Sequence, residues 1–211
     1  KMSPEEHLAH IKQTIDYALS KDFTVNLYLE DWSSGMRDSR DYLFTMMDEL
    51  VKLPIKRFLL PDTLGILNPL QCVEYMRQMV RRYPNSHFDF HAHNDYDLAV
   101  SNSLAAVLSG AKGLHVTVNG LGERCGNAPL ASVQVILKDM FEAKTNIKED
   151  RLNDISRLVE GYSGIAVAPN TPVVGDNVFT QVAGVHADGD NKDKLYCNDL
   201  VPERFGRHRE Y

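Results

Sequence analysis

The sequence has no apolar run of the roughly 18 residues that a membrane-spanning helix requires, so no membrane partner is expected. Its first residues, KMSPEEHLAH, lack the apolar core of a secretory signal. There are three cysteines, Cys72, Cys125 and Cys197, and this odd, widely spaced set favours reduced thiols in the cytoplasm over a disulfide framework. Basic residues are not in excess, because 23 Lys and Arg stand against 29 Asp and Glu. The net charge of −6 weighs against a nucleic-acid partner.

What the chain does contain is a regular alternation of helix-like and strand-like segments. Apolar spacing and turn residues predict helices over 3–20, 41–53, 69–83, 98–110 and 129–141, and strands over 24–30, 57–62, 87–93 and 113–119. This alternation is typical of βαβ units and a parallel sheet. A doubly wound sheet and a (β/α)8 barrel both fit it, but four strands are too few to close a barrel by themselves.

The texture of the sequence changes in the last third of the chain. Residues 142–162 are charged and predicted to be helical, whereas residues from Ser163 onward are rich in Gly, Pro, Asn and Asp. Apolar residues such as Val173 and Phe179 make this stretch too hydrophobic for a free linker. We therefore divide the chain into an α/β region, 1–144, and a helical linker with a small irregular subdomain, 145–211.

Polar residues collect at the carboxyl ends of the four predicted strands. The pairs are Glu30 and Asp31, Asp62 and Thr63, His91 and His93, and Asn119 and Gly120. In parallel α/β folds, ligands bind at this end of the sheet. Four consecutive strands that end in this way indicate a site there.

His91 and His93 lie two residues apart on a predicted strand, so both side chains point to the same face. Two neighbouring imidazoles are what a divalent metal ion requires. The alternative is one buried, hydrogen-bonded histidine beside an exposed one. The position at the end of a barrel-type strand favours the metal.

The segment GLGERCGN, residues 120–127, follows the last predicted strand. Its glycines are spaced one residue too widely for G-x-G-x-x-G, which argues against a dinucleotide loop. The tight glycines instead allow Glu123, Arg124 and Asn127 to turn back over the strand ends. The alternative is a glycine-rich turn in which Glu123 and Arg124 form a surface pair.

Four further candidates each have a simpler alternative. Glu30 could orient a substrate or a water molecule, or could merely be solvated at a strand end. Asp62 and Thr63 could bind a carboxylate substrate or cap the turn in PDTLG. His186, in GVHADG, taken alone is most simply a surface histidine.

Several segments together resemble one family of enzymes. LEDWS, LPDTLGILNP, HAHND, LAVSNSLAAVLSGA, NGLGERCGN and GVHADG occur in the order seen in the Claisen-condensing synthases related to α-isopropylmalate synthase and homocitrate synthase. The resemblance covers nearly the whole chain and is most specific between His91 and Asn127. Lyases of the same superfamily share the His-x-His element but have a different glycine loop. LAVSNSLAAVLSGA is more similar to 2-isopropylmalate synthase, an enzyme of leucine biosynthesis, than to homocitrate synthase.

The resemblance implies that residues 1–144 are the C-terminal part of a (β/α)8 TIM barrel and that a small subdomain follows. It implies a cytoplasmic homodimer that transfers the acetyl group of acetyl-CoA to a 2-oxo acid with the help of a divalent metal ion, Zn, Mn or Mg. Three sets of residues match functional positions: metal ligands His91, His93 and Asn127; catalytic residues Glu30, His186 and Tyr196; and substrate contacts Asp62 and Thr63.

Two features depart from the family. The Arg-Asp-Gly-x-Gln segment that supplies the family's catalytic arginine and acidic metal ligand is absent, so we expect an incomplete and inactive fragment or a chain that pairs with another polypeptide. Tyr96 and Asp97 stand where relatives often have Leu-Gly. Alternatives to 2-isopropylmalate synthesis are homocitrate or citramalate synthesis, a metal-dependent aldolase or lyase, and a non-catalytic remnant that binds or assembles.

Overall fold

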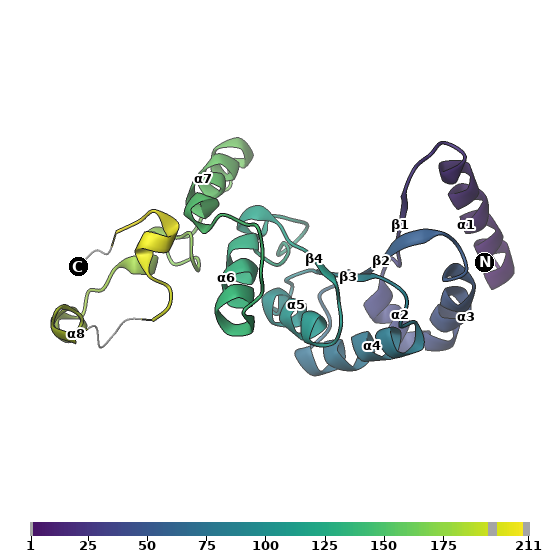
Figure 1. The fold of residues 1–211 in the computed structure, drawn as a ribbon, viewed down its shortest axis with the longest axis horizontal. Helices are drawn as coiled ribbons and strands as arrows, with labels where there is room; N and C mark the ends of the chain where they lie inside the picture. The colour runs from purple at the N-terminus through teal and green to yellow at the C-terminus, as the bar shows by residue number, and fades with distance from the viewer. Residues whose placement is uncertain (1, 194–197, 209–211) are drawn as a thin grey trace. The chain divides into compact units, whose positions relative to one another are not determined.

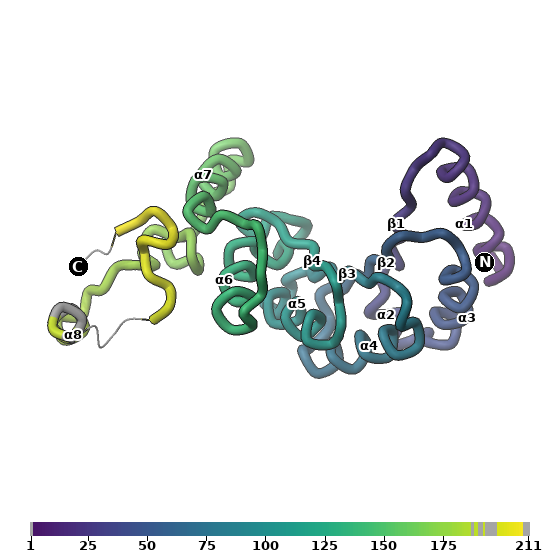
Figure 2. The backbone as a smooth tube through the Cα atoms, in the orientation of Figure 1, coloured from purple at the N-terminus to yellow at the C-terminus, as the bar shows by residue number. Residues whose placement is uncertain are grey.

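The computed structural model describes residues 2–193 and 198–208, which form two compact units, traced as a ribbon in Figure 1 and as a tube in Figure 2. Unit 1 comprises residues 1–116 and 122–128, and unit 2 comprises 117–121 and 129–211. The contacts thus divide the chain earlier than the boundary at residue 144, which stays a prediction. Within the described residues, no helix is both long enough and apolar enough to cross a membrane.

Unit 1 is built on one parallel sheet. Its strands are β1 (Val25–Tyr28), β2 (Ile55–Asp62), β3 (Phe88–Ala92) and β4 (Gly113–His115). They lie in the order β1-β2-β3-β4, so neighbours in sequence are neighbours in the sheet. A doubly wound sheet reverses its strand order, whereas a barrel does not. The sheet therefore has the topology of part of a (β/α)8 barrel.

The described part of unit 1 contains five helices, and side chains cap the first turn of two of them. The five are α1 (Pro4–Leu19), α2 (Trp32–Asp38), α3 (Arg40–Leu50), α4 (Pro69–Arg82) and α5 (Ala99–Leu108). Ser3 and Glu6 form a capping box before α1, and Asn68 and Gln71 form one before α4. Helix α2 was not predicted from the sequence, because its seven residues are too few for a helical period to stand out.

The core of unit 1 lies between the sheet and these helices, which follow one face of the strands (Figure 1). Phe88 and Phe90 of β3 are 1% and 0% exposed, and Trp32 packs edge-on against Phe90 and Tyr75. The alternating residues of β3 point to the opposite face. One face of the strand therefore supplies the core, and the other is left for polar side chains.

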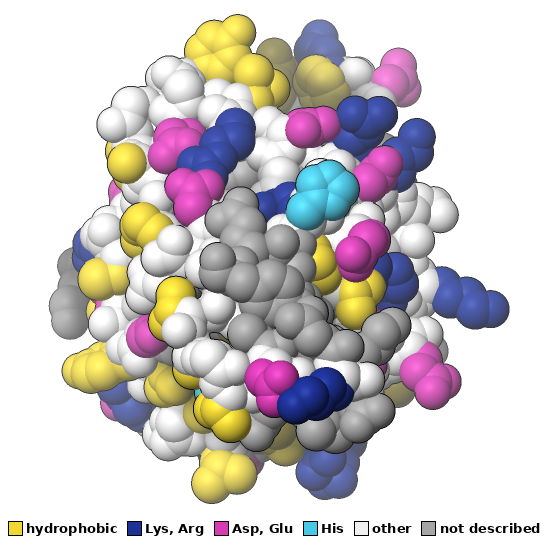
Figure 3. Space-filling model, turned by 90° about the vertical axis from the view of Figure 1, so that its left-hand side faces the viewer, with side chains coloured by type: hydrophobic (Ala, Val, Ile, Leu, Met, Phe, Trp, Pro, Cys, Tyr) yellow, Lys and Arg dark blue, Asp and Glu magenta, His cyan; other side chains and the backbone are white. Residues whose placement is uncertain are grey.

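Unit 2 contains α6 (Leu130–Phe141), α7 (Leu152–Ser163), α8 (Gly184–Asp193) and several short turns. Its core consists of Ala131, Val135, Leu152, Val173, Val174, Phe179 and Phe205. Arg204 binds Asp139 and Glu149, which ties the last turn to α6. On the face that Figure 3 displays, acidic and basic side chains are interspersed rather than gathered by sign.

Two elements differ from the sequence prediction. Strand β4 ends at His115 rather than at residue 119, and Val118–Gly120 form a 3-10 turn in which Asn119 adopts a left-handed conformation with φ of 57°. Residues 184–193 form α8, although no apolar face repeats at helical spacing there. Helix propensity and apolar spacing therefore do not account for this helix.

We predict that the two described cysteines differ strongly in reactivity. Burial raises the pKa of the Cys72 thiol to about 12, and its Sγ lies 3.3 Å from the carbonyl oxygen of Asn102, whereas Cys125 is exposed. At pH 8 only on the order of 10⁻⁴ of Cys72 is thiolate, the reactive form. Iodoacetamide should label Cys125 and spare Cys72 until guanidinium is added, as mass spectrometry of the peptides would show. Equal labelling of the two in the native chain would contradict the burial of Cys72.

Candidate functional site

The end of β3 places two imidazoles side by side. The ring centroids of His91 and His93 are 5.1 Å apart, and the rings meet edge-on at 76°. His91 belongs to the strand, and His93 follows it by one residue. The even spacing that the sequence showed thus brings both rings to one face, as predicted for a metal-binding pair.

The glycine loop adds an amide to this pair. Asn127 forms an isolated bridge with His93, and the Asn94 N–H donates to the carbonyl of Gly126 at 3.0 Å. Nδ2 of Asn127 lies 3.3 Å from Nε2 of His91 and 3.2 Å from the carbonyl oxygen of Ala92. The three predicted metal ligands are therefore neighbours in space, although 36 residues separate His91 from Asn127.

Close packing of the loop explains one of its glycines. A Cβ on Gly122 would overlap Oδ1 of Asn127, so a larger residue there would displace the amide. Only glycine at position 122 allows the Asn127 amide to approach the backbone this closely.

These residues fit a divalent metal ion, but only as part of its coordination shell. Nδ1 of His91 and Nδ1 of His93 are buried and have no hydrogen-bond partner in the described part of the chain. Burial, reinforced by His93 and His115, lowers the pKa of His91 to about 4, so its imidazole is neutral near pH 7. Within the described residues, no cluster of three or more His, Cys, Asp or Glu lies ready to hold a metal ion. Two imidazoles and one amide are short of four ligands.

Glu30 and Thr63 connect the ends of β1 and β2. Oγ1 of Thr63 donates to Oε1 of Glu30 at 2.8 Å and accepts the backbone N–H of Asp31 at 3.0 Å. Asp31 has φ of 55°, a strained conformation for a residue other than glycine. The Thr63 hydroxyl therefore fixes both the turn and the Glu30 carboxylate.

Asp62 has a structural environment. Its side chain is 0% exposed, and its two oxygens accept the N–H groups of Ile66 at 3.0 Å and Leu67 at 3.1 Å. Burial raises the pKa of Asp62, and hydrogen bonds from Ser33 and the turn oppose that shift. The turn-capping alternative accounts for both oxygens, and contact with a substrate stays a prediction.

Sequence reasoning missed a polar layer beside His91, formed by Tyr28, Arg57, His87, Asp89 and His115. Asp89 is 2% exposed and lies 2.7 Å from His87, 3.2 Å from Arg57 and 3.6 Å from His115. Tyr28 is 2.8 Å from His115, and both rings meet His91 edge-on. The sequence does hold a sign of this layer, because polar and apolar residues alternate in HFDFHAH, residues 87–93.

Two predicted catalytic residues belong to the C-terminal stretch of the sequence. His186 is on α8 in unit 2 and is exposed, and its catalytic role stays a prediction. Tyr196 lies outside the residues that the structure describes.

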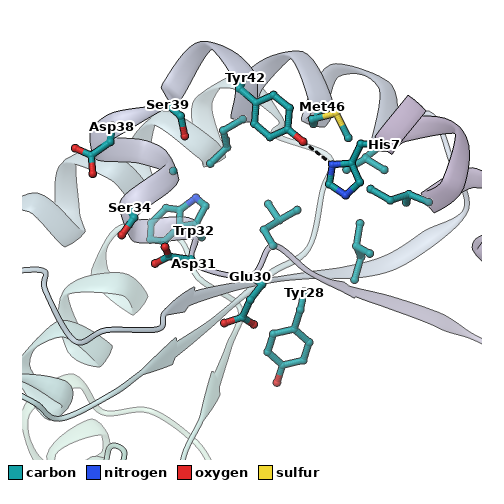
Figure 4. Close-up of a pocket in the computed structure, with 16 residues that line it drawn as sticks. His7, Tyr28, Glu30, Asp31, Trp32, Ser34, Asp38, Ser39, Tyr42 and Met46 are labelled. Carbon is teal, nitrogen blue, oxygen red and sulfur yellow. Dashed lines mark hydrogen bonds between the residues drawn. The ribbon is translucent and has the colours of Figure 1, made fainter. Parts of the chain in front are cut away.

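A cavity of about 540 Å³ opens beside β1, among α1, α2 and α3. His7 and Tyr42 are hydrogen-bonded across it, whereas Glu30 and Tyr28, which also line it, point away from them (Figure 4). The ring of Tyr28 also meets His91 edge-on, so Tyr28 lies between the cavity and the histidine pair.

The sequence model of the HMGL-like family matches residues 1–159. A homocitrate synthase of Saccharolobus islandicus is 42% identical over the whole chain, which covers 45% of that protein. A Methanopyrus kandleri protein, provisionally named an (R)-citramalate synthase, is 36% identical, and the chain covers 41% of it. The chain therefore spans less than half the length of these curated relatives.

Solved structures share the fold. A Bacillus subtilis HMG-CoA lyase superposes with a TM-score of 0.71 over 82% of this chain and 60% of the lyase, at 23% identity. An Acinetobacter baumannii HMG-CoA lyase, solved with coenzyme A and 3-methylmalate, gives a TM-score of 0.53 at 27% identity over 61% of this chain and 44% of its own. These likenesses confirm that the parallel sheet and its helices are part of a TIM barrel.

We predict that Asp62→Asn destabilises unit 1 by about 1–3 kcal/mol, because an amide leaves one of the two buried N–H groups without an acceptor. Urea unfolding followed by the fluorescence of Trp32, the single tryptophan and a buried one, measures the change. The matched control is Asp38→Asn at an exposed position, which should shift stability by less than about 0.5 kcal/mol. Similar midpoints for the two variants would refute the capping role.

Proposed function

The chain belongs to the HMGL-like family, and from that premise we propose that it carries part of the site of a metal-dependent acyltransferase that condenses acetyl-CoA with a 2-oxo acid. The observation that carries this proposal is the grouping of His91, His93 and Asn127 at the carboxyl edge of the sheet. The homocitrate synthase relative, at 42% identity over the full chain, supports acyl transfer more strongly than the 27% likeness to a lyase supports bond cleavage.

The chemistry follows from the donor set. His91, His93 and the amide oxygen of Asn127 are the proposed ligands, and an imidazole or amide that coordinates a metal ion adds no charge to it. A divalent ion held there would act as a Lewis acid toward the ketone oxygen of the 2-oxo acid, and neutral ligands leave that acidity undiminished.

Proton handling is assigned to carboxylate and imidazole groups. Thr63 binds Oε1 of Glu30, and we assign Oε2 to a substrate hydroxyl or a water molecule. His186 is assigned a role in proton transfer, for which an imidazole suits neutral pH. Tyr196 remains its proposed partner.

The choice of 2-oxo acid is the finer part of the proposal. The run LAVSNSLAAVLSGA favoured 2-isopropylmalate synthesis, whereas the named relatives are a homocitrate synthase and a protein named for citramalate synthesis. Removal of the acetyl unit from these two products leaves 2-oxoglutarate and pyruvate. We therefore place these two acids before 2-oxoisovalerate, the acid that corresponds to 2-isopropylmalate.

We predict that a longer protein containing this sequence releases coenzyme A from acetyl-CoA when 2-oxoglutarate or pyruvate is present, and that the 211-residue chain alone does not. The reason is that the described residues contain no group of three or more His, Cys, Asp or Glu that could hold a metal ion. A free-thiol assay with the three 2-oxo acids measures both outcomes. Robust turnover by the 211-residue chain, or none by any longer form, would overturn the respective half of the prediction.

We also predict that the chain binds Co²⁺ weakly through the histidine pair. His91→Ala and His93→Ala should each weaken the affinity by about 10-fold or more in isothermal titration calorimetry, because each removes a nitrogen ligand. The matched control is His10→Ala on the exposed surface of α1, which should bind like the unchanged chain. Equal affinities of all four proteins would mean that the metal binds elsewhere.

A further inference from the structure

Three loops at the carboxyl edge of the sheet converge on one side chain, that of Arg124. Its Nε and Nη2 donate to the two oxygens of Asp95 at 2.7 and 3.0 Å. Nη2 also donates to the backbone carbonyl of Thr63 at 2.6 Å. The guanidinium thus joins the loops that follow β2, β3 and β4.

The surface pair of Glu123 and Arg124 that the sequence allowed is present, but the contacts with Asp95 are shorter. Arg124 lies 3.7 Å from the Glu123 carboxylate, which is 82% exposed, whereas the Asp95 carboxylate is 22% exposed and bound by both arms of the guanidinium. A guanidinium that binds both oxygens of a carboxylate fixes the orientation of the two side chains as well as their separation. Asp95 and Thr63 therefore determine where the glycine loop lies.

The backbone at this point is shaped for the contact. Arg124 has φ of 55°, which an L-residue other than glycine adopts at a cost. Gly65 has φ of 60°, and a Cβ there would lie 3.0 Å from the Asp95 nitrogen and 2.8 Å from its Oδ2. The turn after Thr63 can approach Asp95 only because residue 65 is glycine.

The loop that Arg124 holds is the loop that delivers Asn127. Gly126, two residues further on, accepts the Asn94 N–H at 3.0 Å, and Asn127 then meets His91 at 3.3 Å. Release of Arg124 would leave Asn127 held by that backbone bond and by its contact with Ala92.

We propose that Arg124 is a positioning residue: acting through Asp95 and Thr63, it keeps Asn127 against His91 and so holds the proposed third ligand beside the histidine pair. This proposal rests on the proposed function, because it concerns the same metal site. It assigns no contact with metal or substrate to Arg124. Its effect should appear as a loss of metal affinity without a matching loss of folding stability, since an exposed ion pair contributes little to stability.

The test compares Arg124→Gln with Arg82→Gln in the 211-residue chain. Arg82 also binds one carboxylate with two arms, Nε to Oδ1 of Asp48 at 3.1 Å and Nη2 to Oδ2 at 2.6 Å, but it lies on α4 away from the site. Arg124→Gln should weaken Co²⁺ binding by about 10-fold, the usual effect of removing a group that orients a ligand. It should also abolish hydrogen-exchange protection of the Asn94 amide, whereas Arg82→Gln should do neither.

A third variant, Arg124→Lys, separates charge from geometry. Lysine keeps the charge but cannot reach Asp95 and the Thr63 carbonyl together as a fork, so it should restore affinity only in part. Full restoration by lysine, or unchanged Asn94 protection in Arg124→Gln, would overturn the proposal. So would parallel losses of affinity and of the urea midpoint, which would reveal general destabilisation. If the unaltered chain binds no Co²⁺, the proposed function and the metal-site role of Arg124 both fail, and the exchange data alone decide whether Arg124 holds the loop.

Discussion

β3 hydrogen-bonds to β2 on one side and to β4 on the other, and both ladders are parallel. The register places His91 between Pro61 and His115. Because side chains alternate along a strand, a slip of one residue would turn His91 and His93 toward the helices and Phe90 toward the site. The same parallel pairing brings the carboxyl ends of the strands to one edge, where the loops that complete the site begin. The register and direction of β3 therefore determine where the histidine pair lies and which loops meet beside it.

Much of unit 1 could be predicted from the sequence because its signals are local. Apolar spacing and the two capping boxes at Ser3 and Asn68 give α1 and α4 nearly to the residue. The errors arise where a few residues decide the structure. Helix α2 buries only Trp32, Ser33 and Met36 in seven residues, and a 3-10 turn with Asn119 in a left-handed conformation follows β4. Neither feature has a period that a sequence pattern can display.

The candidate site divides in the same way. The grouping of His91, His93 and Asn127 could be predicted because a two-residue spacing and a glycine loop next to the strand ends are visible in the sequence. The environment of Asp89 could not, since Arg57 comes from β2 and His115 from β4, and both reach Asp89 only through strand pairing. For Asp62 the sequence left two roles open, and the capping role became visible only with its burial and its two N–H partners, which a dipeptide such as Asp-Thr does not reveal.

Alternate residues of β3 point to opposite faces, and the two faces contribute differently to stability and to the candidate site. Phe88 and Phe90 lie against the helices, and burial of such a side chain stabilises a fold by about 1.5–3 kcal/mol. Asp89 and His91 lie on the other face, where a buried charge is tolerated only with partners, here Arg57 among others. Residues on the polar face can therefore change without disturbing the aromatic core, provided that each buried charge keeps its partner. The two relatives are named for different products, citramalate and homocitrate. Such differences are compatible with one aromatic core.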